Sequence, residues 1–520
     1  MALREESLEM AADESQGRGL LVGEILRRAV ESVPNAPAAS MGSVVCSYAQ
    51  LASDADRLAA ALRHQAGVGH GDRVVCWVDT ALEVLPLFFA VAKLGAVFVP
   101  LNARLGVEEA GDVAALARGS LLVTDGARWP DAAQLAGIAD IDRTALLPVG
   151  KSAETALETL VLDPERLPDP PRPIFEPRLV ETDPHVIFFT SGSTGRPKGV
   201  VLSHRVNWLR GFHGVFRDEP ERSVCMFPLF HMAGFTLSIS AWQTRGEIIL
   251  AAPNAKSLLD AIERRRANRI NALPLVWERI LAEDTTRWDL SSLTQLDTGT
   301  SATPIELLCQ LKDRFPQASV RIYYGSTEVG TATALCDADV LRKPGSVGQA
   351  SASVDVRLDE DGEILVRSPF LLDGYFDDPE ATAAAQLDGW FRMGDLGAFD
   401  DEGYLSIIGR KKEVVRSGGE SVSPTEVEGV LRSAAGVAEV AVVGLPDAKW
   451  GEIVCAAIVC EVGATVSLAD LQAHCEGKLA GFKKPRRIAV VGSFPRTAAT
   501  AQVQRRVLVE QILAEGLATA

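Results

Sequence analysis

Apolar side chains recur at helical spacing in the first part of the chain and are separated by short, strongly apolar runs. Residues 19–33 and 48–63 place apolar side chains three and four positions apart, which predicts two amphipathic helices, the first ending before Pro34. The run RVVCWV at 73–78 follows and is typical of a buried strand. Because helix and strand keep alternating, we predict a parallel sheet with helices on its faces. The alternation continues with a helix at 82–96, a strand at 97–102, a helix near 108–118, a strand at 120–125 and a second α/β block at about 201–335.

The pattern changes after Lys343 to short β runs broken by Gly and Asp turns, which predicts a β-rich subdomain. From about residue 413 the order is helix, strand, strand, helix, strand. We therefore predict the α/β fold class, with a large N-terminal domain of layered α/β subdomains plus a β-rich subdomain at 1–410. A small, mobile α+β domain is expected at 411–520.

Composition and charge narrow the class of protein. A chain of 520 residues is too long for one core, so at least two domains are expected. With 47% hydrophobic residues and a net charge of −17, we expect an ordinary globular protein that binds neither nucleic acid nor an anionic membrane. The apolar run 84–101 contains Lys93 and two prolines, which favours a buried helix and strand over a membrane span. The eight cysteines form no C-x-x-C pair, as expected of reduced residues in a cytoplasmic protein.

A loop of small residues follows the predicted strand at 186–189. Its glycines let backbone N–H groups turn toward a ligand, and its hydroxyls add donors, so it is suited to phosphate oxygens. Lys198 adds a point charge, and Gly199 after it distinguishes the loop from that of ordinary NTPases, where Ser or Thr follows the lysine. A plain surface turn is the alternative interpretation of such a loop. The candidate phosphate-binding residues are Thr190, Ser191, Gly192, Ser193, Thr194, Gly195 and Lys198.

The string TSGSTGRPKGV at 190–200 resembles the signature of the adenylate-forming superfamily, which comprises acyl-CoA synthetases, luciferases and the adenylation domains of peptide synthetases. Further strings at 298–301, 323–328, 389–395 and 409–412 resemble later motifs of this family, in family order. The resemblance covers nearly the whole chain and is closest to acyl- or aryl-CoA ligases. It implies ATP and Mg²⁺ as cofactors and CoA as a co-substrate.

The resemblance also implies roles for the matched residues. Tyr324 would give adenine a stacking face, Thr327 would hold the α-phosphate, and Glu328 would hold Mg²⁺. Asp395 would accept hydrogen bonds from the ribose hydroxyls, and Arg410 would add a ribose or phosphate contact. The remaining ATP-binding candidates are Gly299, Thr300, Ser301, Gly325 and Ser326.

His231 is a single histidine among apolar residues, and such a residue is more often packed than catalytic. By resemblance it lines the acid pocket and joins Thr327 and Glu328 as a catalytic candidate. Peptide-synthetase domains typically carry an Asp here to pair with an α-amino group, so an α-amino acid is disfavoured as the substrate. A mid-sized aryl or acyl acid is expected. The pocket candidates are His231, Phe235, Trp277, Thr300 and Tyr323.

Lys412 occupies the hinge position of the family, where the C-terminal domain swings between two half-reactions. Residues 417–428 resemble the loop that approaches the pantetheine tunnel in CoA-using members. The resemblance thus implies that acid and MgATP meet at the junction of the two domains.

One motif departs from the family near the C-terminus. Members typically carry Gly-Lys before Val-Gln, and this lysine bridges the carboxylate and the α-phosphate. Aligned on Val503, the lysine position is Gln502, the last catalytic candidate. Losing one such donor typically costs about 10²–10³ in rate. Three interpretations stay open: a CoA ligase in which Arg496 or Arg505 substitutes for the lysine, a divergent biosynthetic member, or a nucleotide-binding pseudoenzyme. The intact phosphate, magnesium and ribose motifs argue against the pseudoenzyme.

We therefore predict an ATP-dependent ligase that activates an aryl or acyl carboxylic acid as acyl-AMP, releases pyrophosphate and transfers the acyl group to CoA. The divergent alternative would use adenylation for amide formation or for nitrite-dependent diazotisation of an aryl amine. The oligomeric state is not predicted.

Overall fold

The computed structural model describes residues 19–150, 160–170, 173–190, 197–212, 219–418, 420–497 and 502–519. By internal contacts the chain forms two compact units. Unit 1 runs to residue 344 and also includes 350–354 and 367–389, and unit 2 comprises 345–349, 355–366 and 390–520. The predicted domain boundary after residue 410 and the hinge at Lys412 stay predictions.

The first sheet of unit 1 has the order β2-β1-β11-β10-β12-β13-β14-β15. Strands β1 and β10 to β14 are parallel, whereas β2 pairs antiparallel with β1 and β15 pairs antiparallel with β14. In the β13–β14 register Gly299 lies opposite Tyr323, so the motifs that follow these strands meet at one edge. The strands are β1 (Pro37–Met41), β2 (Val44–Ser47), β10 (Arg222–Cys225), β11 (Glu247–Leu250), β12 (Arg269–Asn271), β13 (Gln295–Gly299), β14 (Ser319–Ser326) and β15 (Gly330–Leu335).

The second sheet of unit 1 has the order β19-β9-β8-β4-β3-β5-β6-β7. Its antiparallel end, β19-β9-β8, brings a segment from late in the chain beside the strands that flank the predicted phosphate loop. The strands are β3 (Arg73–Trp77), β4 (Val97–Pro100), β5 (Leu121–Thr124), β6 (Thr144–Leu146), β7 (Leu160–Val161), β8 (Pro184–Thr190), β9 (Lys198–Ser203) and β19 (Gly374–Tyr375). The two-residue strand β20 (Gln386–Leu387) comes after β19 in the chain and does not belong to this sheet.

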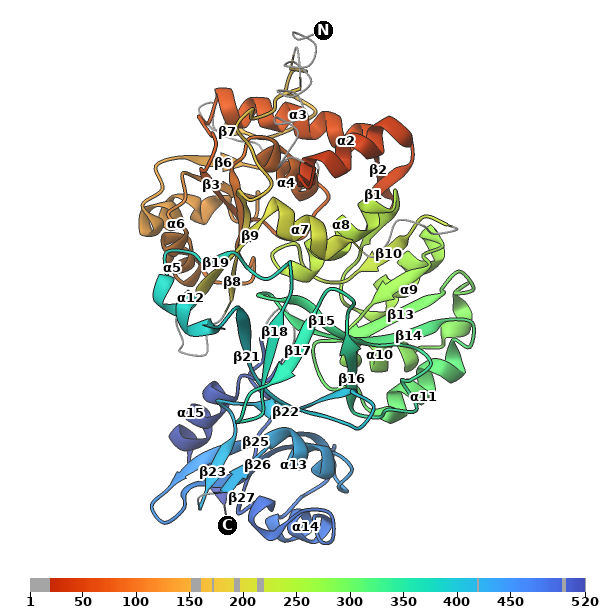
Figure 1. Cartoon of the computed structure of the whole chain (residues 1–520), viewed down its shortest axis with the longest axis vertical. Helices are drawn as coiled ribbons and strands as arrows, with labels where there is room; N and C mark the ends of the chain where they lie inside the picture. The colour runs from red at the N-terminus through yellow and green to blue at the C-terminus, as the bar shows by residue number, and fades with distance from the viewer. Residues whose placement is uncertain are drawn as a thin grey trace. The chain divides into compact units, whose positions relative to one another are not determined.

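Helices cover the sheets of unit 1, and α7 and α8 pack side by side (Figure 1). Helix α4 is apolar on all sides and is buried along nearly its whole length. From it Phe88 stacks on Phe235 of α8, with ring centroids 4.3 Å apart. The helices are α2 (Val22–Ser32), α3 (Tyr48–His64), α4 (Val84–Lys93), α5 (Val107–Ala117), η1 (Trp129–Asp131), α6 (Ala132–Ala139), α7 (His204–Gly211), α8 (Met232–Gln243), α9 (Ala255–Arg265), α10 (Pro274–Leu281), η2 (Thr285–Arg287), α11 (Ile305–Arg314) and α12 (Pro379–Ala385).

Unit 2 contains the β-rich segment, whose strands have the order β17-β18-β21-β22-β16. Its other sheet has the order β24-β23-β26-β27-β28, and β25 pairs with β26 as well. Helices α13, α14 and α15 accompany the second sheet. The elements are β16 (Ser346–Ala350), β17 (Asp355–Leu358), β18 (Glu363–Arg367), β21 (Trp390–Phe399), β22 (Leu405–Arg410), β23 (Val415–Ser417), β24 (Glu420–Val422), α13 (Pro424–Leu431), β25 (Val437–Asp447), β26 (Gly451–Cys460), α14 (Leu468–His474), η3 (Gly481–Lys483), β27 (Arg487–Val490), α15 (Arg505–Glu515) and β28 (Ala518–Thr519).

The structure confirms the predicted mixed α/β architecture, including the helix at 48–63 and the β-rich segment. The C-terminal part also contains the β23–β24 hairpin and helix α15, which the predicted element order lacks. Helix α15 buries only Leu508 and Ile512, so its apolar pattern is weak. Within the described residues no helix is both long and apolar enough to cross a membrane.

Candidate functional site

The predicted phosphate loop joins β8 to β9. Thr190 ends β8 and pairs with Lys198 at the start of β9, and the Thr190 hydroxyl donates to the Lys198 carbonyl oxygen at 3.5 Å. The loop residues Ser191, Gly192, Ser193, Thr194 and Gly195 lie outside the described residues, so their phosphate contacts stay predictions. The antiparallel ladder therefore fixes both ends of the loop and places the predicted cation at its exit.

The carboxyl end of β14 carries the predicted adenine and phosphate residues. Gly325 lies in the β14–β15 hairpin, and a Cβ there would lie 1.8 Å from the Gly330 carbonyl oxygen, so only glycine fits. Ser326 ends the strand, and its hydroxyl oxygen accepts a hydrogen bond from the Glu328 N–H at 3.2 Å. The half-buried Tyr324 and Thr327 flank this tight turn. The turn brings an aromatic ring, hydroxyls and a carboxylate together.

A buried arginine fixes the backbone of this turn. Arg210 of α7 is 5% exposed and donates at 2.7 Å to the carbonyl oxygens of both Thr327 and Glu328. It also donates to the Phe370 carbonyl oxygen at 3.0 Å. Burial lowers the pKa of Arg210 to about 10, which still leaves it charged at neutral pH. The buried Arg210 therefore connects the backbone of this turn to helix α7.

The Glu328 side chain is held by a tyrosine that the sequence analysis did not select. Tyr375 of β19 donates its hydroxyl to Glu328 Oε1 at 3.2 Å, and its ring centroid lies 4.8 Å from Lys198 Nζ. Burial and the Glu328 charge raise the pKa of Tyr375, so it stays protonated and remains a donor. Tyr375 belongs to the two-residue strand β19, and nothing in the sequence near it indicates the contact, because Glu328 and Lys198 are distant in sequence.

The described residues contain no group of three or more His, Cys, Asp or Glu side chains that could hold a metal ion. Glu328 is instead a single, half-buried carboxylate with one oxygen oriented by Tyr375. Mg²⁺ that accompanies a nucleotide is usually bound through one or two carboxylates plus phosphate oxygens. A single oriented carboxylate of this kind fits Mg²⁺ carried by ATP.

Gly299, Thr300 and Ser301 follow β13 at the same sheet edge. A Cβ at Gly299 would lie 2.3 Å from the Tyr323 carbonyl oxygen, so glycine is required. Thr300 has a φ of +68°, a left-handed conformation that is strained for a β-branched residue. Thr300 and Ser301 are exposed. The contact of Thr300 and Ser301 with ATP stays a prediction.

His231 caps the N-terminus of α8, and its Nδ1 accepts a hydrogen bond from the Ala233 N–H at 3.2 Å. Its ring stacks near Phe227, with centroids 6.1 Å apart. Burial lowers the pKa of His231 to about 4, so the imidazole is neutral at pH 7. A neutral imidazole cannot form an ion pair with a substrate ammonium group, in agreement with the sequence argument against an α-amino acid.

The other predicted pocket residues have structural contacts of their own. Phe235 is 1% exposed and belongs to the aromatic cluster around Phe88. Trp277 is also 1% exposed, and its Nε1 donates to the Asp297 carbonyl oxygen at 3.1 Å, which supports β13. Tyr323 is half-buried, and burial raises its pKa. Their predicted contact with the acid stays a prediction.

Unit 2 holds the predicted ribose pair and the predicted hinge. Asp395 on β21 is 5% exposed and lies opposite Arg410 on β22, with an Asp395 Oδ1 to Arg410 Nε distance of 2.9 Å. Lys412 lies in the turn after β22. Its neighbour Lys411 is tied to Glu363 by an ion pair of 3.0 Å. The pairing of β21 with β22 therefore brings the two predicted ribose residues together.

Gln502 lies beside a short antiparallel bridge between Arg496 and Val503. Its carbonyl oxygen accepts from the Thr497 N–H at 2.8 Å, and its own N–H donates to Thr497 Oγ1 at 3.1 Å. Among the two candidate substitutes for the lysine, Arg496 pairs with Glu439. Arg505 pairs at 2.7 Å with both Glu413 and Glu428. Each candidate cation is thus already engaged with carboxylates.

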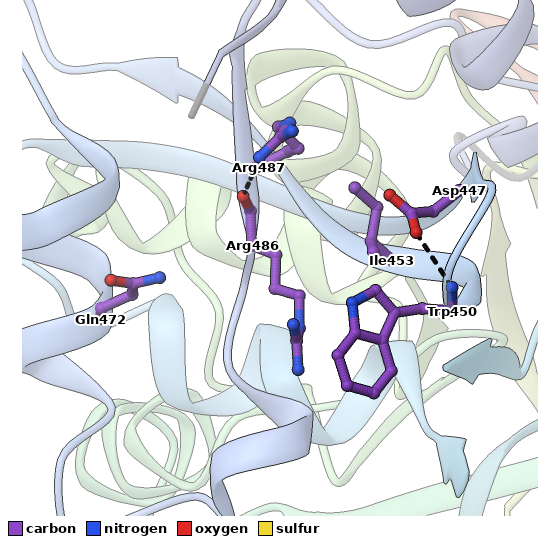
Figure 2. A pocket seen from close by; sticks show the side chains of 6 residues that line it. All are labelled: Asp447, Trp450, Ile453, Gln472, Arg486 and Arg487. Carbon is purple, nitrogen blue, oxygen red and sulfur yellow. Dashed lines mark hydrogen bonds between the residues drawn. The ribbon is translucent and has the colours of Figure 1, made fainter. Parts of the chain in front are cut away.

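A hollow of about 240 Å³ in unit 2 was also not anticipated from the sequence. Figure 2 shows Arg486 beside the indole of Trp450, and its guanidinium carbon lies 4.4 Å from the ring centroid. The basic run KKPRR, in a chain of net charge −17, was the available signal. The hollow is lined by Asp447, Trp450, Ile453, Gln472, Arg486 and Arg487.

Comparison with known proteins identifies the family. The family model of the AMP-binding enzyme matches residues 26–376, and that of the AMP-binding enzyme C-terminal domain matches residues 426–500. The indoleacetate–CoA ligase of Aromatoleum aromaticum is 36% identical over 87% of this chain and 90% of its own length.

Two solved structures are similar along nearly their whole length. The ATP-bound MatB of Rhodopseudomonas palustris has a TM-score of 0.84 and 27% identity, covering 94% of this chain and 99% of that one. The amide bond synthetase McbA of Marinactinospora thermotolerans has a TM-score of 0.83 and 26% identity, with the same coverage of 94% and 99%. The chain therefore belongs to the AMP-binding enzyme family and is an AMP-forming adenylating enzyme of the acyl- or aryl-CoA ligase type.

Proposed function

We propose that the protein activates an aromatic or acyl carboxylic acid as acyl-AMP, with release of pyrophosphate, and then transfers the acyl group to CoA. ATP use fits the family, and an aromatic acid is the substrate named for the indoleacetate–CoA ligase relative. The neutral His231 supports an acid without an α-amino group. The aryl class of acid is therefore the first to test.

In this proposal the residues of unit 1 bind the adenine and the phosphates. The ring of Tyr324 stacks on adenine, the Thr327 hydroxyl donates to the α-phosphate, and Lys198 binds the β- and γ-phosphates together with the loop before it. Mg²⁺ at Glu328 would neutralise phosphate charge. The acid's carboxylate oxygen then forms a bond to the α-phosphorus, while the bond from this phosphorus to the bridging oxygen breaks and pyrophosphate leaves. Catalysis is thus mainly positioning and charge neutralisation.

Asp395 of unit 2 accepts hydrogen bonds from the ribose hydroxyls in this proposal. Its ion pair with Arg410 orients the carboxylate, because the two residues lie opposite each other on neighbouring strands. Lys412, two residues after Arg410, is proposed as the hinge between the two half-reactions.

The observation that carries the choice of CoA is the hollow of unit 2. CoA ends in a phosphorylated adenosine diphosphate, which needs a stacking face and cations. The Arg486 guanidinium lies against the indole of Trp450 and offers its planar group for stacking, and Arg486 and Arg487 together offer guanidinium groups, which bind phosphates in a bidentate manner. The hollow also adjoins the segment that resembles a pantetheine loop, because the Gly418 N–H donates to the Trp450 carbonyl oxygen at 2.9 Å.

The test is an acceptor screen. Acid-dependent ATP–pyrophosphate exchange first identifies an activated acid, and CoA, an amine and nitrite are then offered in turn, with products identified by mass. We expect AMP and an acyl-CoA. ADP in place of AMP would contradict adenylation.

A variant links the screen to the hollow. Arg486→Gln should raise the KM for CoA about tenfold, because a hydrogen bond from a charged group to phosphate is lost. The control is Arg506→Gln, the same change at an arginine that pairs with Glu510 on exposed α15. An unchanged KM for CoA in Arg486→Gln would contradict the assignment of the hollow.

A second candidate function is amide formation. It is favoured by Gln502 at the lysine position and by the similarity to the amide bond synthetase McbA. An amide in the screen, with no acyl-CoA, would select this function. A diazonium product would select the nitrite-dependent alternative.

A further inference from the structure

Tyr375 contacts both Glu328 and Lys198, the charged side chains that the proposed function assigns to Mg²⁺ and to the phosphates of ATP. Its hydroxyl donates to Glu328 Oε1 at 3.2 Å. The centroid of its ring lies 4.8 Å from Lys198 Nζ, within the range of a cation–π interaction. One half-buried side chain thus joins an anion and a cation that come from different sheets of unit 1.

The position of the ring follows from strand pairing. Tyr375 lies opposite Val200 in the antiparallel β19–β9 pair. Lys198 is two residues from Val200 and therefore lies on the same face, at a diagonal distance that aromatic and long side chains span. The Phe376 N–H donates to the Gly199 carbonyl oxygen at 2.7 Å, and the Tyr375 N–H donates to Thr382 Oγ1 at 2.9 Å. The backbone of Tyr375 is therefore held on both sides.

The backbone of Glu328 is also fixed. Arg210 and the Leu372 N–H both donate to the Glu328 carbonyl oxygen, each at 2.7 Å. These bonds leave the side-chain torsions of Glu328 undetermined. The bond from Tyr375 acts on the carboxylate itself and selects one orientation for it.

We propose that Tyr375 is a positioning residue that orients the Glu328 carboxylate toward a nucleotide-borne divalent cation with its hydroxyl and steers Lys198 with its ring face. The proposal rests on the proposed use of MgATP. It predicts that the two parts of the side chain have separable effects, the hydroxyl on metal affinity and the ring on nucleotide affinity.

Two substitutions separate these parts. Tyr375→Phe keeps the ring and removes the hydroxyl, and Tyr375→Leu removes both. The probe is Mn²⁺, titrated into the full-length protein with α,β-methylene-ATP and followed by electron paramagnetic resonance. Tyr375→Phe should weaken Mn²⁺ binding about tenfold and leave nucleotide affinity in EDTA unchanged. Tyr375→Leu should in addition weaken nucleotide affinity in EDTA about threefold.

Tyr48→Phe is the matched control, because it removes a buried hydroxyl that donates to the Gly246 carbonyl oxygen at 2.6 Å and should leave Mn²⁺ affinity unchanged. In a Glu328→Gln background, Tyr375→Phe should cause no further loss. Equal Mn²⁺ affinity of the wild type and Tyr375→Phe would overturn the proposal. If the wild type binds the analogue but no acid yields AMP, the proposed function fails while this binding test still decides the role of Tyr375.

Discussion

The turn at Thr327–Glu328 and the bridge at Arg496–Val503 are both assigned to adenylation, yet the structure holds them in different ways. The turn is tied to the buried Arg210, and its carboxylate accepts a bond from Tyr375. At the bridge, backbone bonds hold Gln502, whose side chain has no charge. In the proposed function the first region supplies charges for a nucleotide, whereas the second has Gln502 at the position where the family typically carries a catalytic lysine. The difference teaches that the proposed nucleotide turn is held by side-chain contacts from distant segments, whereas the bridge beside Gln502 is held by local backbone pairing.

The largest effect is expected from Glu328→Gln. If the turn supplies the charge that holds the metal, this change should lower acid-dependent ATP–pyrophosphate exchange by about 10²–10³, because a charge-stabilising group is lost from the site. Glu283→Gln is the control, since it makes the same change at an exposed position of unit 1. Exchange within a few fold of the wild type would remove Glu328 from the proposed site.

The second effect tests the other side of the comparison. Gln502→Lys should increase acyl-adenylate formation about tenfold, because it restores part of a charge whose loss typically costs about 10²–10³. Single-turnover formation of the acyl-adenylate is the measurement. Gln504→Lys, the same change two residues along the chain, should give no gain. A Gln502→Lys variant that is no faster than wild type would mean that the missing charge is compensated or irrelevant to the natural substrate.

The sequence predicts the first region better than the second because the information there is local. The order of Tyr324, Thr327 and Glu328 after an apolar strand is readable as chemistry, and the structure brings these residues together in one turn. Arg210 and Tyr375 could not be found in this way, because strand and helix packing alone brings them to the turn. Helix α15 was missed for a related reason, since it buries too few residues to show a helical pattern.

The predicted ribose residues show the same limit of sequence-based prediction. Asp395 and Arg410 were each selected from a motif, but their ion pair depends on the β21–β22 register, which no single motif contains. Gln502 was recognised as a departure by alignment on Val503, whereas the engagement of Arg496 and Arg505 with carboxylates required coordinates. Side-chain contacts between segments that are distant in sequence are therefore the feature of the site that motifs do not predict.

The third expected effect concerns His231 of unit 1 and the dependence of the free energy of unfolding on pH. The pKa of His231 is lowered by burial to about 4, whereas in the unfolded chain it is about 6.5. Below pH 6.5 the unfolded chain therefore binds a proton that the folded protein does not. The free energy of unfolding should fall by about 1.4 kcal/mol for each pH unit between 6.5 and 4 because of this residue.

His231→Asn keeps a side-chain acceptor at the N-cap and should remove this contribution. The measurement is the free energy of unfolding in urea at pH 7, 6 and 5. His474→Asn makes the same change on α14 of unit 2 and serves as the control. A slope for His231→Asn identical to that of wild type would mean that this histidine is not buried in the neutral form.

The smallest effect is expected at Thr300, which follows β13 and has a strained left-handed backbone, whereas Gln502 at the bridge has no positive φ. A β-branched residue at a φ of +68° costs roughly 1–3 kcal/mol, and glycine there would cost about 0.5–1 kcal/mol in unfolded-state entropy. Thr300→Gly should therefore raise the free energy of unfolding by about 1 kcal/mol and lower the KM for bulkier acids, because a methyl and a hydroxyl leave the pocket. Thr294→Gly, at an exposed threonine outside the left-handed region, should instead lower stability. If Thr300→Gly destabilises the protein as much as Thr294→Gly does, the threonine is held by contacts worth more than its strain, and its role is structural.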